Sequence, residues 1–103
     1  MTPEKYGSSE QTSRVCRALV MLAGNTVNGM LPGELAKALN TSPATITRML
    51  AHLKQEGFVE ETKLGGRWRL GSRVAQIGLA ALADVAARES ELNEIKQRYS
   101  RTI

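Results

Sequence analysis

The sequence predicts a mainly α-helical fold with one small β-hairpin and a long C-terminal helix. Apolar residues recur at helical spacing in most of the chain, and a two-residue alternation replaces that spacing between residues 58 and 70. A Gly-Gly pair interrupts the alternation, as a tight hairpin turn requires. Two helices joined by a short polar turn and followed by such a hairpin are typical of a winged helix-turn-helix.

The first helix is expected over residues 10–24. Ser8, with Gln11 three residues later, fits a capping pair at its start, and Gly24 fits its end. Cys16 falls within this helical pattern, which favours a packed thiol over a reactive one. One face carries the apolar residues at spacings of three and four, namely Val15, Ala18, Leu19 and Leu22.

Two prolines and a polar break predict the helix-turn-helix itself. Pro32 suits the first position of a second helix, because its missing N–H would be unpaired there anyway, and Glu34 falls near the positive end of that helix. A polar run then breaks the pattern, with Ser42 as N-cap and Pro43 at the start of a third helix over residues 43–56. The expected core positions are Leu35, Ala36, Leu39, Ile46, Met49, Leu50 and Leu53.

Residues 58–70 are expected to form the hairpin, which we call the wing. Gly65 and Gly66 allow the positive φ angles of a tight turn. In the return strand Trp68 and Leu70 share one face, so we interpret Trp68 as a core residue rather than as a stacking platform. The other face turns two arginines outward together, Arg67 and Arg69.

A long helix is expected to follow, from about Arg73 to Tyr99, or roughly 40 Å at 1.5 Å per residue. Its small residues allow another helix to approach closely, and it is longer than a three-helix core can cover. We therefore expect it to join two copies of the chain. The expected dimer contacts are Val74, Ile77, Ala81, Val85, Leu92 and Ile95.

The amino-acid composition limits the classes of function that the chain can have. The 103 residues carry a net charge of +4, which favours an anionic partner. One cysteine and one histidine exclude an internal disulfide and a zinc site of usual composition, and we expect no metal or cofactor. Paired carboxylates, a nucleophile with its base and a phosphate-cradling glycine loop are not visible, so an enzyme is not expected. Without a secretory or membrane-length apolar segment, we expect a cytoplasmic protein with no membrane partner.

The third helix carries short polar side chains opposite its apolar positions. The major groove of B-DNA admits one α-helix, and hydroxyls there can bond base edges or phosphates. Arg48 can bind a guanine or clamp a phosphate, whereas the alternative is a solvated helix face. His52 lies two turns along, facing solvent or the margin of the groove. The candidate residues are Thr41, Ser42, Ala44, Thr45, Thr47 and Arg48, of which Ser42 and Thr41 also serve as capping residues.

The tip of the wing supplies a second set of candidates. Cations beside small glycines can neutralise phosphates, although such charges are also common on solubilising edge strands. Arg14 and Arg17 of the first helix are candidates for flanking phosphates. The wing candidates are Lys63, Gly65, Gly66, Arg67 and Arg69.

Two runs of the sequence carry a family resemblance. The run LPGELAKALNTSPATITRMLAHLKQEGFVE is similar to the helix-turn-helix of IclR-type transcription regulators, and GGRWRLGSRVAQIG to their wing and linker helix. The resemblance covers about Ser13 to Gly78 and implies operator binding as a dimer, with Thr45, Thr47 and Arg48 touching DNA. Family members continue into an effector-binding domain, whereas this chain stops after one helix, so no small-molecule effector is implied.

These observations predict a sequence-specific regulator of transcription that binds double-stranded DNA as a homodimer, most simply as a repressor. The alternative is a winged-helix protein–protein interaction module that uses the long C-terminal helix. The expected organisation is a flexible arm over residues 1–9, a winged helix-turn-helix over 10–71 and a dimerisation helix over 72–103. Steep salt dependence of DNA binding would favour the regulator, and a flat response the interaction module.

Overall fold

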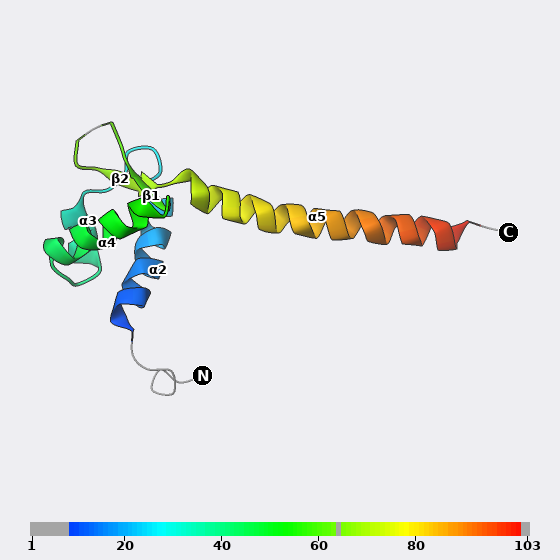
Figure 1. Cartoon of the computed structure of the whole chain (residues 1–103), viewed down its shortest axis with the longest axis horizontal. Coiled ribbons are helices and arrows are strands. Elements are labelled where there is room, and N and C mark those ends of the chain that lie inside the picture. Colours follow the sequence, from blue (N-terminus) through cyan, green and yellow to red (C-terminus); the bar gives the residue numbers. More distant parts are fainter. Residues whose placement is uncertain (1–8, 64, 102–103) are drawn as a thin grey trace. The chain divides into compact units, whose positions relative to one another are not determined.

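The computed structural model describes residues 9–63 and 65–101. Its elements, in chain order, are α2 (Glu10–Ala23), α3 (Pro32–Ala38), α4 (Pro43–Gln55), β1 (Val59–Glu61), β2 (Trp68–Leu70) and α5 (Ser72–Ser100). The fold class is therefore confirmed, a winged helix-turn-helix with a small antiparallel hairpin and a long C-terminal helix (Figure 1). The chain divides into two compact units between Ser72 and Arg73.

Helix α2 contributes one face to the core, as predicted. Ala18 and Leu22 are fully buried. Its N-cap is Ser9, whose hydroxyl accepts the N–H of Thr12 at 3.3 Å, whereas the expected cap, Ser8, lies outside the described residues. The prediction of a packed Cys16 is wrong, because this residue is exposed. A separation of two residues corresponds to a rotation of about 200° around an α-helix, so Cys16 lies on the side opposite the buried Ala18.

Helices α3 and α4 pack against each other across the predicted turn. Each begins at its proline, and the Ser42 hydroxyl caps α4 by accepting the Thr45 N–H at 3.1 Å. Asn40 takes a left-handed conformation with φ of 54°, which reverses the chain between the helices. Helix α4 ends at Gln55, one residue before the predicted end. The buried residues that fill the space between α2, α3, α4 and β1 are Ala18, Leu22, Leu35, Ala36, Leu39, Ile46, Met49, Leu50 and Val59.

The two strands of the hairpin pair antiparallel. Val59 pairs with Leu70, so the core face of β1 meets the core face of β2. Trp68 is half-buried against the core, as predicted, and the Lys54 ammonium lies 5.9 Å from its ring centre. The loop before α3 meets the wing in an isolated bridge, in which Met30 and Trp68 exchange N–H···O bonds of 2.7 and 2.8 Å.

Helix α5 forms the second unit almost entirely by itself. A lone helix has no other element to cover its side chains, and none of its described residues is buried. Its large apolar residues, including Leu92 at 65% exposure, therefore face outward. No helix in the described ranges is long and apolar enough to cross a membrane.

Candidate nucleic-acid interface

Helix α4 presents one face away from the core. Because Ile46, Met49 and Leu50 are buried, the positions about half a turn away are exposed. The exposed predicted residues on α4 are Ala44, Thr47 and Arg48, and His52 is exposed at its side. The structure therefore brings Arg48 together with two small neighbours on a continuous outward face.

Two further residues extend this face. Ala51 and Gln55 are exposed at three and seven positions beyond Arg48, which places them on the same side of α4. Neither residue is among the candidates predicted from the sequence, although their spacing from Arg48 was the available signal. The outward face of α4 is therefore formed by Ala44, Thr47, Arg48, Ala51 and Gln55.

The start of α4 is held by its own hydroxyls. Thr45 is half-buried, and its hydroxyl lies 2.9 Å from that of Ser42. Thr41 is half-buried in the turn, where its N–H donates to the Ala36 carbonyl at 2.9 Å. These three residues therefore perform a capping and turning role, and Ser42 alone among them is exposed.

Cations around this face differ in their partners. Lys54 pairs with Glu61 at 3.1 Å, and Arg69 pairs with Glu60, its register partner, at 3.0 Å. No ion pair between described residues involves Arg48 or Lys63, and both are exposed. Arg48 and Lys63 therefore keep their full charge available to an anion.

The tip of the wing is exposed at Lys63, Gly65 and Gly66. Gly66 has φ of 81°, so the prediction of a positive φ angle in the Gly-Gly pair is confirmed at this residue. Apart from its two chain neighbours, no described atom lies within 4 Å of the place where a Cβ of Gly65 would stand.

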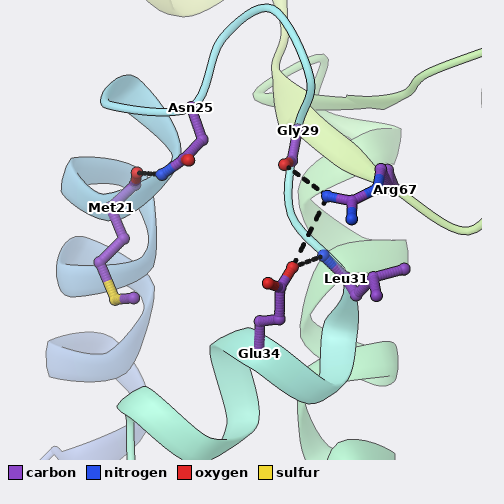
Figure 2. A network of polar contacts seen from close by, with 6 residues as sticks. All are labelled: Met21, Asn25, Gly29, Leu31, Glu34 and Arg67. Carbon is purple, nitrogen blue, oxygen red and sulfur yellow. Dashed lines mark hydrogen bonds and ion pairs between the residues drawn. The ribbon is translucent and has the colours of Figure 1, made fainter.

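Arg67 has a different environment from Arg69. Its Nη1 donates to the Gly29 carbonyl at 3.1 Å and lies 3.7 Å from Oε1 of Glu34 (Figure 2). The sequence predicts that Arg67 turns outward together with Arg69, and this prediction is wrong for the Arg67 side chain. Its guanidinium is held by the Gly29 carbonyl oxygen and by a carboxylate oxygen of Glu34. The sequence alternation gives the strand face but not the direction of so long a side chain.

The other predicted residues belong to α2 and α5. In α2, Arg14 pairs with Glu10 at 3.5 Å, and Arg17 is exposed. No group of three or more metal-ligating side chains is found among the described residues. The predicted dimer contacts on α5 are exposed, except for the half-buried Val74, and they are Ile77, Ala81, Val85, Leu92 and Ile95.

Comparison with known proteins places this fold among DNA-binding domains. Residues 13–75 match the family model of the Crp-like helix-turn-helix domain. The crystal structure of HmgR from Pseudomonas aeruginosa is similar in fold, with 22% identity, a TM-score of 0.58 and coverage of 84% of this chain and 38% of that one. A putative IclR transcriptional regulator from Silicibacter sp. TM1040 has 25% identity and a TM-score of 0.50, over 73% of this chain and 32% of that one.

One curated protein is also similar over part of the chain. The riboflavin kinase of Thermococcus kodakarensis is 44% identical over 52 residues, which are 50% of this chain. The chain spans about a quarter of the length of that relative, 24%.

Proposed function

Because this chain belongs to the Crp-like helix-turn-helix domain family, we propose that it is a sequence-specific regulator of transcription of the IclR type. In this proposal α4 reads the major groove of double-stranded DNA and the wing holds the adjacent backbone. The observation that carries it is the outward face of α4, on which an exposed and unpaired Arg48 stands between small side chains. The likeness to the IclR structure supports the family subtype.

The chemistry of this face suits base recognition. Ala44, Thr47 and Ala51 are short, so the helix backbone can approach the floor of a groove that admits one α-helix. Arg48 is long enough to donate two hydrogen bonds to O6 and N7 of a guanine. At the Ser42 end of α4, Pro43 has no N–H and the Thr45 N–H is bonded to Ser42, so the Ala44 N–H is the donor of this turn that can bind a phosphate in a contact independent of sequence.

The wing supplies the backbone contact. Lys63 is exposed near Gly65, where a Cβ would meet no described atom within 4 Å. Arg69 shares its charge with Glu60, so its attraction for a phosphate is weaker than that of Lys63. The wing therefore adds affinity for any sequence, while α4 adds discrimination.

Helix α5 is proposed to join two copies. Its residues at alternating spacings of four and three form an unbroken heptad seam: Val74, Gly78, Ala81, Val85, Arg88, Leu92, Ile95 and Tyr99. Such a repeat is the signature of a two-stranded coiled coil, and the seam contains one charged residue, Arg88. Ile77, also among the expected contacts, flanks the seam. A homodimer would read two half-sites of a palindrome and could repress by occupying a promoter.

A protein–protein interaction module is the second candidate. The exposed apolar residues of α5 favour it, because the same seam could accept a helix of another protein. In that case the unpaired cations would be incidental. We propose no enzymatic role, since the family match and the outward face of α4 both concern binding.

Selection of bound fragments from random duplex DNA tests the first candidate against the second. We expect a recurrent palindromic site, bound with an affinity that falls by about three orders of magnitude between 50 and 200 mM salt if some six phosphates are contacted. Failure to enrich any sequence, together with a flat salt response, would favour the interaction module.

A further inference from the structure

We propose that Arg67 locks the wing onto the helix-turn-helix and supports DNA binding as a positioning residue rather than as a phosphate contact. The wing lock consists of Arg67, Gly29, Leu31 and Glu34. Its role in DNA binding rests on the proposed function, whereas its role in placing the wing does not.

The lock joins segments that are far apart in the sequence. The Arg67 Nη1 donates to the Gly29 carbonyl at 3.1 Å and lies 3.7 Å from Glu34 Oε1. The same carboxylate oxygen accepts the N–H of Leu31 at 2.8 Å, at the start of α3 (Figure 2). One carboxylate therefore caps the first helix of the helix-turn-helix and holds Arg67, the residue that precedes β2.

The backbone around the wing lock is closely packed at Gly29. Gly29 has φ of +75°, and a Cβ added there would stand 2.6 Å from the Trp68 carbonyl oxygen. Met30, which follows Gly29, and Trp68, which follows Arg67, exchange two backbone hydrogen bonds. The Arg67 side chain thus adds a contact beside the backbone bridge that joins the loop before α3 to the wing.

Burial and charge separate Arg67 from the other wing cations. Its side chain is 34% exposed and faces a carbonyl and a carboxylate, whereas Lys63 is exposed and has no ion pair among the described residues. A phosphate approaching Arg67 would have to compete with Glu34. The two possible roles of Arg67 therefore predict opposite effects of neutralising Glu34 on DNA affinity. If Arg67 is a phosphate contact, the change frees it and affinity rises. If Arg67 is a positioning residue, the change releases it and affinity falls.

The test compares Glu34→Gln and Arg67→Gln with the wild-type chain and with Lys63→Gln. Glutamine keeps an oxygen that can accept the Leu31 N–H, so Glu34→Gln removes mainly the charge. We expect both lock variants to lower affinity for selected and random duplexes by about two- to fivefold, the scale of a half-exposed ion pair. The slope of log affinity against log salt should stay unchanged in Arg67→Gln, while Lys63→Gln should reduce it by about 0.9.

Hydrogen exchange without DNA tests the lock on its own. The amides of Met30 and Trp68 should exchange faster in Arg67→Gln and Glu34→Gln than in the wild type, and at the wild-type rate in Lys63→Gln. Unchanged exchange in both lock variants would overturn the lock. A rise in affinity in Glu34→Gln, or a slope reduced by about 0.9 in Arg67→Gln, would show Arg67 to be a phosphate contact. If the wild type binds no duplex, the proposed function fails while the exchange rates still decide the lock.

Discussion

At the scale of single residues, Arg48 combines three properties that no other described cation of the domain combines. It stands on the outward face of α4, its neighbours on that face are short, and no described carboxylate pairs with it. Arg69 and Lys54 each lack the third property, because Glu60 and Glu61 hold them. Arg48 is therefore the side chain from which we expect base discrimination.

Replacing Arg48 with alanine should weaken binding to a selected duplex by about 5- to 150-fold, the value of one bidentate base contact. Binding to random duplex should fall much less. Arg98→Ala removes an equal charge from α5 and serves as the control in the same gel-shift titrations. Equal losses in Arg48→Ala and Arg98→Ala would remove Arg48 from the interface.

Gly29 gives a residue-scale prediction about stability. Gly29→Ala combines a left-handed backbone with a close approach to the Trp68 carbonyl, so it should lower the free energy of unfolding by about 1–3 kcal/mol. Gly33→Ala is the matched control, because Gly33 lies in α3 with nothing within 4 Å of its missing Cβ. It should raise the free energy of unfolding by about 0.5–1 kcal/mol. Urea unfolding of the two variants distinguishes them, and equal stabilities would contradict the strained turn.

At the scale of elements, α5 carries apolar residues both on and off its heptad seam. Leu92 lies in the seam and Leu79 outside it, yet their exposed fractions are 65% and 64%. Exposure alone therefore does not distinguish a contact from an ordinary surface leucine. The spacing does, because only residues that repeat every seven positions face a partner helix along the whole seam.

Leu92→Lys should weaken self-association by at least about tenfold, because it places like charges opposite each other in the seam. Leu79→Lys should leave the dimer intact. Sedimentation equilibrium of both variants measures the difference. A dimer of undiminished strength in Leu92→Lys would take this seam out of the interface.

The elements themselves were predictable because each has a local signal. Pro32 and Pro43 mark the starts of α3 and α4, the Gly-Gly pair marks the turn of the wing, and a change of period from 3.6 to 2 marks β1. The N-cap of α2 was less certain, because Ser8 and Ser9 are adjacent serines and local sequence does not choose between them. Long-range partners had no such signal.

The wing lock shows why long-range partners could not be predicted from the sequence. Arg67 bonds to a carbonyl 38 positions away in the sequence, and alternation along a strand gives no information about that loop. The exposure of Cys16 was, by contrast, available from the sequence, since its helical angle from Ala18 places it away from the core. What sequence alone gives for the candidate site is therefore the face of α4, while the division of cations into paired and unpaired ones needs the structure.

At the scale of the whole molecule, net charge describes the domain incompletely. The chain carries 14 Lys and Arg against 10 Asp and Glu, but several of these acids are engaged in holding basic side chains in place around the wing. Among the cations that form no ion pair within the described residues, Arg48 lies on the outward face of α4 and Lys63 at the tip of the wing. We expect a DNA phosphate to be attracted to these two positions of the domain.

An NMR titration of the isotopically labelled chain with its selected duplex tests the central claim most directly. We predict that the backbone amides of the outward face of α4 and of the Lys63–Gly66 turn shift most, while those of the heptad seam change little on adding DNA to the preformed dimer. Shifts confined to α5, with α4 unperturbed at saturation, would contradict the account.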